Sequence, residues 1–265
     1  MMVRKIAPTL LIVTGLAACS DGFGPGGDPI RRVSFTVSTS APGAAPGFAA
    51  ADSIVRGGHT LVLSKVELVL RSIKLHRVER STDCSDDDDD SNSGSSSASS
   101  ATSSDDDYCE KFVAGPMLLD LPLGADVRRL VTVEVDTGTY RRLEFKIHKP
   151  EDDGDDAEDT QFLRDHPDLD RISTRVTGTY DGRTFVYISD LNAKQRTDLV
   201  PPLVVGARAN TDLTLVVDVR KWFVDRAGAL IDPQSGLKGQ RNDDLVRDNI
   251  RRSFRFFQGN NNDDD

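Results

Sequence analysis

After residue 18 the sequence has no apolar run of the roughly 20 residues that a membrane-spanning helix requires. It is also short of positive charge, because 33 Lys and Arg residues face 43 Asp and Glu residues, for a formal net charge of −10. Such a balance is a poor general match for nucleic acid or anionic lipid. The composition therefore argues against a spanning helix and against a nucleic-acid partner, and we expect any membrane attachment to be through a lipid.

The sequence also lacks the short motifs of common catalytic sites. It has no Gly-x-Ser-x-Gly, no His-Glu-x-x-His and no phosphate-binding P-loop. The histidines are scattered and are expected to be ordinary polar residues: His59, His76, His148 and His166. We therefore expect a non-catalytic protein with no cofactor and no metal site, while a hydrolase with an unrecognised carboxylate site stays open as an alternative.

What the chain does have is an N-terminal export segment. Arg4 and Lys5 supply a positive start, and the apolar run Ile6–Leu16 follows. The ending Leu16-Ala17-Ala18-Cys19 resembles the lipobox of bacterial lipoproteins. The resemblance implies that residues 1–18 are a signal peptide and that Cys19 is lipidated as the first residue of the mature chain. An ordinary cleaved signal with a chance cysteine is the alternative.

The next residues bear on location. Residues 19–30 are rich in glycine and have too little apolar content to fold, so they are predicted to form a flexible tether. Lipoproteins with Asp directly after the lipidated cysteine tend to stay in the inner membrane, and this chain has Ser20 there. The resemblance thus implies a cell-envelope protein, anchored in the outer membrane and facing the periplasm or the cell surface.

Cysteine is scarce, with three in the whole chain. With Cys19 assigned to the anchor, an exported and oxidising setting favours a disulfide between Cys84 and Cys109. These two residues flank the Ser- and Asp-rich segment 81–107, which is predicted to be a disordered insertion because it has little apolar surface to bury. Loop-entropy models give about 3 kcal/mol of stabilisation for such a crosslink.

Alternation of apolar and polar residues predicts a mainly β, antiparallel domain over residues 31–235. The apolar sets that define the strands are Val33, Phe35 and Val37; Val66, Leu68 and Leu70; Val131, Val133 and Val135; Leu143, Phe145 and Ile147; Leu213, Leu215, Val217 and Val219. After Leu70 the apolar set moves to Ile73 and Leu75, which predicts a one-residue bulge near Arg71. Glu144 and His148 fall on the outward face by the same alternation.

Asp181-Gly182 predicts a two-residue hairpin turn, because both central residues must accept a positive φ. The hairpin joins 172–180 to 183–189 and pairs Tyr180 with Arg183, Gly178 with Phe185 and Val176 with Tyr187. The face assigned to the core contains Ile172, Val176, Phe185 and Tyr187. Pro201-Pro202 cannot donate ladder hydrogen bonds and indicates an edge strand or a bend.

The period changes near the C-terminus. Apolar residues recur at spacings of three and four, which predicts one amphipathic helix from Asp243 to Gln258 within a helical segment 236–258: Leu245, Val246, Ile250, Phe254 and Phe257. Packing of the helix on the β-domain and contact with a membrane or a partner are both open. An acidic tail, 259–265, follows.

The segment Glu151–Asp159 concentrates carboxylates around Gly154, and such hard oxygen ligands suit calcium. Its order does not match an EF-hand, so a solvated acidic loop is the main expectation and weak calcium binding is the alternative. The aromatic residues Tyr140, Trp222 and Phe223 could form a sugar-binding platform, but the alternation favours a place in the core.

Two segments resemble an uncharacterised family of bacterial lipoprotein β-domains. They are Met117–Leu121 with Leu123-Gly124, and Gly138-Thr139-Tyr140-Arg141-Arg142-Leu143; the run Leu213–Arg220, ending in Asp-x-Arg, is similar as well. Over about residues 31–224 the resemblance implies a Greek-key β-sandwich and an envelope location. We predict a lipid-anchored, non-catalytic ligand-binding or structural module with a protein or glycan partner. The alternatives are a calcium-assisted carbohydrate- or protein-binding module and an envelope hydrolase.

Overall fold

The computed structural model describes residues 31–39, 53–78, 109–113, 115–123, 127–206 and 211–259. The expected signal peptide, Cys19, the tether over 19–30, Cys84, the insertion 81–107 and the tail beyond Gly259 lie outside the described residues. Among the residues that are described, no helix is both long and apolar enough to cross a membrane.

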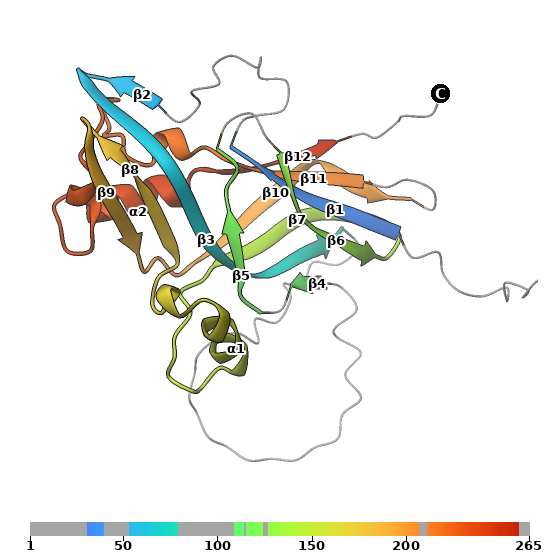
Figure 1. Cartoon of the computed structure of the whole chain (residues 1–265). Helices are drawn as coiled ribbons and strands as arrows, with labels where there is room; N and C mark the ends of the chain where they lie inside the picture. The colour runs from blue at the N-terminus through green and yellow to red at the C-terminus, as the bar shows by residue number, and fades with distance from the viewer. Residues whose placement is uncertain are drawn as a thin grey trace, which may run out of the picture.

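The chain forms the expected mainly β structure, with 55% strand and 16% helix in two sheets that pack as a sandwich (Figure 1). The smaller sheet has the order β12-β11-β1-β6, with bounds Phe254–Gly259, Thr211–Val217, Arg31–Ser38 and Val127–Val135. The larger sheet contains β10, β7, β3, β8 and β9, with bounds Ala193–Val205, Gly138–Ile147, His59–Arg77, Thr174–Tyr180 and Arg183–Ser189. Three short strands also pair with β3: β2 (Ser53–Arg56), β4 (Cys109–Val113) and β5 (Met117–Asp120).

One strand pairing departs from the fully antiparallel expectation. β1 and β11 are parallel neighbours, with Val33 opposite Thr211 and Val37 opposite Leu215. Alternation along a strand reports which side chains face inward, but it carries no information about the direction of the neighbouring strand. Parallel neighbours need a long connection, and here the connection includes the whole larger sheet.

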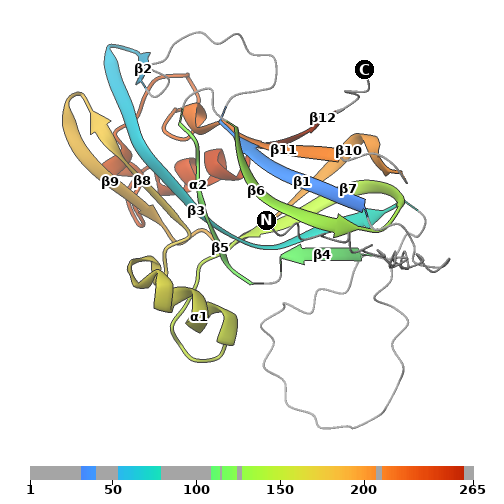
Figure 2. The ribbon, with the colours of Figure 1, turned by 45° about the vertical axis from the view of Figure 1, so that its right-hand side comes forward.

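The core lies between the two sheets, and Figure 2 shows β1, β6 and β11 layered over β7 and β3. Phe145 of β7 makes edge contacts across the sandwich with Phe254 and Phe256 of β12, at ring-centroid distances of 5.2 and 5.9 Å. Tyr140, Trp222 and Phe223 are fully buried, as the core interpretation predicts, so they form no exposed platform. Each large apolar side chain buried in this way contributes about 1.5–3 kcal/mol.

Strand β3 is the spine of the larger sheet, with 19 residues. The predicted bulge is confirmed: the register of β3 against β7 shifts between Arg71 and Lys74, and Ser72 has a φ of 54°. The extra residue lets Leu70, Ile73 and Leu75 all stay buried although their parity changes.

The larger sheet forks along β3. Leu68 pairs with Leu119 of β5 and with Thr174 of β8, whereas Leu70 pairs with Met117 of β5 and with Ile147 of β7. A strand has only two edges, and β5 occupies one of them here. β8 and β7 therefore pair with the other edge of β3, β8 with its first half and β7 with its second half. The segment between them, residues 148–173, therefore has to cover the point where the sheet divides.

The hairpin prediction is confirmed in its register, with Tyr180 opposite Arg183, Gly178 opposite Phe185 and Val176 opposite Tyr187. Asp181 and Gly182 have φ values of 50° and 79°, as the two-residue turn requires. Strand β8 begins at Thr174, however, so Ile172 does not lie in the hairpin and packs instead in a small second cluster with Val69.

The Pro201-Pro202 prediction also holds. These residues lie in β10, whose pairing with β7 is interrupted between Asp198 and Leu203. β10 is at the end of the strand order of the larger sheet, where missing donors cost little.

The C-terminal helix is shorter than predicted. α2 spans Asp243–Arg251 and buries Val246 and Ile250, but Phe254–Gly259 is strand β12, which pairs with β11. Over so few residues, the apolar spacing of Phe254 and Phe257 does not distinguish a helix from a strand. The strand forms because the edge of β11 offers backbone hydrogen bonds to this segment. The prediction of one helix to Gln258 was wrong for this reason.

Candidate functional site

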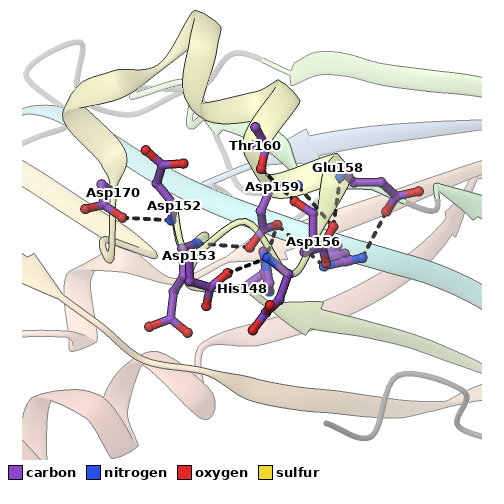
Figure 3. A network of polar contacts seen from close by, with 11 residues as sticks. His148, Asp152, Asp153, Asp156, Glu158, Asp159, Thr160 and Asp170 are labelled. Atoms are coloured by element: carbon purple, nitrogen blue, oxygen red, sulfur yellow. Dashed lines mark hydrogen bonds and ion pairs between the residues drawn. The ribbon is translucent and has the colours of Figure 1, made fainter. Parts of the chain in front are cut away.

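The acidic segment that suggested calcium begins a helix that the sequence analysis did not predict. α1 spans Ala157–Asp165, and Asp156 is its N-cap: the Asp156 carboxylate accepts hydrogen bonds from the backbone N–H groups of Glu158 and Asp159, at 2.8 and 3.2 Å. Figure 3 shows these residues clustered at the start of the helix. An Asp at an N-cap followed by acids in the first turn is a helix-start pattern, and this signal in Asp156–Asp159 could have located α1.

α1 covers the fork of the larger sheet. Val69 of β3 lies at the fork, where its carbonyl accepts from the His148 N–H at 2.9 Å and its own N–H donates to Ser173 at 2.8 Å. The Val69 side chain packs against a small apolar cluster supplied by α1 and the turn after it: Phe162, Leu163 and Leu169. The segment 148–173 is thus anchored at both of its ends to one residue of the spine.

Arg71, next to the bulge in β3, holds the start of α1 electrostatically. Its guanidinium pairs with Asp156, with Glu158 at 2.9 Å and with Asp159 at 3.5 Å. Partial burial opposes the charged form of Arg71, but the hydrogen bond and the charges of these carboxylates outweigh it and raise its pKa. The same contact with Arg71 holds the pKa of Asp156 below its usual value, despite the opposing effect of burial.

His148 forms a buried pair with Asp159, which corrects the prediction that His148 is an outward polar residue. Nε2 of His148 lies 2.7 Å from Oδ1 of Asp159, and the two residues are 5% and 4% exposed (Figure 3). Burial is the largest influence on the pKa of His148 and lowers it, although the Asp159 carboxylate acts in the opposite direction. Since a carboxylate only accepts, a neutral His148 donates through Nε2–H. Asp159 also accepts from the Glu151 N–H at 3.0 Å.

Three carboxylates of this segment converge on the guanidinium of Arg71, so their charge is already neutralised by a protein cation. Asp153 accepts from the Asp155 N–H at 3.2 Å, while Asp156 and Asp159 serve the helix, Arg71 and His148. Over the described part of the chain, no group of three or more His, Cys, Asp or Glu residues is placed to hold a metal ion. These carboxylate contacts therefore hold α1 in place over the fork.

The other histidines lie apart from this network. His59 contacts Asp181 at 2.7 Å and stacks on Tyr180 beside the hairpin turn, and His166 follows α1 and contacts Phe162. His76 is buried on β3, 3.8 Å from Glu144, and burial lowers its pKa. Glu144 is likewise buried, against expectation, and is bound by Arg196 at 2.7 Å. At Glu144, Arg196 and Lys194 approach the carboxylate at 2.7 and 3.8 Å, and long side chains of this kind can cover an outward-facing position.

Of the two cysteines expected to form a disulfide, Cys109 opens β4 and is opposite His76, whereas Cys84 is outside the described residues. The described residues contain no disulfide. The pairing remains a prediction, as does the lipid on Cys19.

An open hollow of about 770 Å³ is present on the side of the sandwich where the two sheets meet. The larger sheet and the segment after β5 contribute Ser64, Lys65, Asp120, Leu121, Pro122 and Leu123. The smaller sheet contributes Val127, Arg128 and Arg129 from the start of β6. Its volume is in the range of small-molecule sites, which run from about 300 to 1,000 Å³. The sequence analysis did not identify this site, because Ser64 and Lys65 are far along the chain from the other lining residues, 120–123 and 127–129.

Among the described residues that line the hollow, the charged side chains are those of Lys65, Asp120, Arg128 and Arg129. Arg128 donates to the Asp120 carbonyl at 3.0 Å and lies 3.3 Å from its carboxylate, so this pair joins the two sheets at the rim. Lys65 pairs with Glu67 at 2.6 Å. Arg129 is exposed and makes no ion pair with any residue in the described ranges.

Comparison of the chain with models of protein families, with characterised proteins and with solved structures found no match. The resemblance to lipoprotein β-domains therefore stays a prediction based on the residues quoted for it.

Proposed function

We propose that this protein is a lipid-anchored module of the cell envelope that binds a ligand without catalysing a reaction. The observation that carries the binding part is the hollow between β3, β5 and β6, because residues of both sheets line it with charged and apolar groups. Leu121 is buried at the floor, and charged side chains surround it.

The backbone supports a preformed site. The Leu121 N–H donates to the Val66 carbonyl at 2.9 Å, and the hydroxyl of Thr39 donates to the Pro122 carbonyl at 2.7 Å. These bonds tie the segment after β5 to both sheets. A ligand in this hollow would meet a backbone that these two hydrogen bonds already hold in place, which lowers the entropic cost of binding.

The proposed location at the cell envelope depends on the N-terminal residues of the sequence. Export through the signal peptide 1–18 and lipidation of Cys19 would place the domain at the outer membrane, on a tether of residues 19–30. The oxidising setting would form the Cys84–Cys109 disulfide. Two or more acyl chains on Cys19 would anchor the domain without a spanning helix, because a single chain gives only marginal, reversible membrane binding.

The membrane part of the proposal is tested on the native protein and on Cys19→Ser. Mass spectrometry of the mature chain should find an acylated Cys19 at the N-terminus, and the protein should fractionate with membranes. Cys19→Ser should abolish acylation and processing after residue 18. An unmodified mature N-terminus at any other residue would refute the anchor.

A further inference from the structure

We infer that the outward face of β7, β10 and the second half of β3 is a docking surface for the acidic segment 81–107 of the same chain. This surface is distinct from the hollow described above. Outward side chains on these strands alternate with buried core residues such as Leu143 and Phe145. They include five cations, which we call the basic face: Lys74, Arg142, Lys146, Lys194 and Arg196.

The register of the sheet brings three cations into one row. Lys146 of β7 is directly opposite Arg71 of β3 and directly opposite Lys194 of β10. Like charges in directly opposed positions destabilise a sheet. The carboxylates at the start of α1 supply the countercharge of Arg71, at one end of the row. Lys146 forms no ion pair with any described residue, so additional negative charge beside the row would stabilise the sheet.

The carboxylates on this side of the sheet are shared among the cations. Glu144 lies 2.7 Å from Arg196 and 3.8 Å from Lys194. Asp198 lies 2.9 Å from Arg142. These two carboxylates oppose the five cations of the basic face. The face therefore has a surplus of positive charge, although the whole chain has a net charge of −10.

The chain itself contains a segment of matching charge. Residues 81–107 have nine Asp and no Lys or Arg, so they account for nine of the ten net negative charges. Both ends of this segment join the larger sheet beside the basic face, because β3 ends at Arg77 and β4 begins at Cys109. Cys109 pairs with His76, and the same row continues to Arg142. The segment therefore starts and ends next to the strands that carry the cations.

The segment is also long enough to lie over the basic face. Asp86–Asp90 begins nine residues after Arg77, and an extended chain of that length spans up to about 30 Å. Asp105–Asp107 ends two residues before Cys109. Adjacent strands are about 4.8 Å apart, so Lys194 on β10 lies about 10 Å across the sheet from β3. Both acidic runs can therefore reach the face, and the tether at each end gives them a high effective concentration there.

Burial indicates that the occupant of this face belongs to the chain. Lys74 and Glu144 point outward, yet they are only 7% and 3% exposed, so the middle of the face is covered. Arg142, Lys194 and Arg196 also each make a further contact besides the pairs given above. A face that is covered in the folded chain favours a segment of that chain over a separate acidic protein as the occupant.

The test is carbodiimide crosslinking of the full chain in a neutral detergent. The reagent takes up one water as it joins a lysine amine to a carboxylate in contact with it, and mass spectrometry identifies the joined residues. Lys146 and Lys194 should crosslink to aspartates of 81–107, and less so at about 1 M salt, where the Debye length is about 3 Å. In a mixture of unlabelled and isotopically labelled protein, both residues of each crosslink should carry the same label.

Lysine acetylation gives a matched comparison. Changing the nine Asp of 81–107 to Asn should raise the acetylation rates of Lys146 and Lys194 several-fold, because nearby carboxylates cover the amines and keep them protonated. Changing nine serines of the segment to Asn keeps its charge and should leave both rates unchanged. Lys238, whose side chain is 77% exposed beside Asp190, should react equally in all three proteins. Crosslinks between differently labelled chains would overturn the inference, as would rates at Lys146 and Lys194 that the loss of the nine charges leaves unaltered.

Discussion

The imidazole of His148 and the carboxylate of Asp159 form a 2.7 Å pair that is buried against the larger sheet. His148 directly follows β7 and is hydrogen-bonded to Val69 at the fork, and Asp159 belongs to the first turn of α1. Arg71 contacts the same carboxylate from β3 at 3.5 Å. This three-way contact joins the spine, the segment after β7 and the helix, so its titration and its removal should be visible in the stability of the domain.

The burial of His148 predicts a loss of stability on mild acidification. Its pKa is lowered in the folded state, chiefly by burial. At pH values between the folded and the unfolded pKa, His148 is therefore protonated in the unfolded chain and neutral in the folded one. The free energy of unfolding should therefore fall as pH decreases from about 6.5 through the lowered pKa, with a slope of up to about 1.4 kcal/mol per pH unit from this group. The charged groups that face the ring are Asp159, Arg71 and Lys146.

Urea unfolding at several pH values measures this slope. His148→Gln should remove the contribution of His148 to this slope. Burial also lowers the pKa of His76, so the contribution of His76 to the slope should remain. His59→Gln is the control at an exposed site. A slope that His148→Gln leaves unchanged would contradict the assignment.

The N-cap of α1 predicts a difference between neighbouring aspartates. Asp156→Ala removes the cap and the contact with Arg71, and should cost about 1–2 kcal/mol of unfolding free energy. Asp156→Asn keeps a capping oxygen and should cost less. Asp153→Ala, at an exposed position, should change stability by less than about 0.5 kcal/mol. Equal losses for Asp156→Ala and Asp153→Ala would argue against the cap.

The engagement of the carboxylates predicts no calcium selectivity. Because Asp156 and Asp159 are occupied by the helix, Arg71 and His148, the melting temperature should respond alike to millimolar calcium and magnesium. A specific ligand at about 100 times its dissociation constant would stabilise the fold by about 2.7 kcal/mol. A melting temperature that rises with calcium but not with magnesium would contradict this prediction. It would indicate that the segment Glu151–Asp159 binds calcium and would favour a calcium-assisted module.

Gly178 in β8 should tolerate no side chain. A Cβ at this position would lie 2.0 Å from the Val62 carbonyl oxygen, so the paired backbones would have to separate. Gly178→Ala should cost about 1–3 kcal/mol, the range for overpacked sites. Gly206→Ala is the matched control, because nothing lies within 4 Å of the added Cβ there. Thermal unfolding of the two variants should differ accordingly; similar melting temperatures would refute the close approach.

The Cys84–Cys109 disulfide predicts a specific thiol count. The exported protein should have no titratable thiol from these two residues before reduction, and Cys84→Ser with Cys109→Ser should lower the free energy of unfolding by about 3 kcal/mol. Free thiols in the native protein would rule out the crosslink.

By itself the sequence determined the local β structure of this protein. The alternation at Val33–Val37 and Leu143–Ile147, the parity change that requires the bulge beside Arg71, and the Asp181-Gly182 turn all depend on short-range rules, and the structure agrees with each. Backbone sterics and the period of a strand act over a few residues, so they can be read without knowledge of distant segments.

Tertiary structure alone decided the rest. The parallel pairing of β1 with β11, the conversion of Phe254–Gly259 into a strand, the burial of Glu144 and His148, and the hollow between β3 and β6 each bring together segments that are far apart in the chain. Which edge a strand meets, and which charges cover which face, depend on contacts that a local pattern does not encode. Long-range packing therefore overrode local periodicity at these places, and it created the candidate binding site.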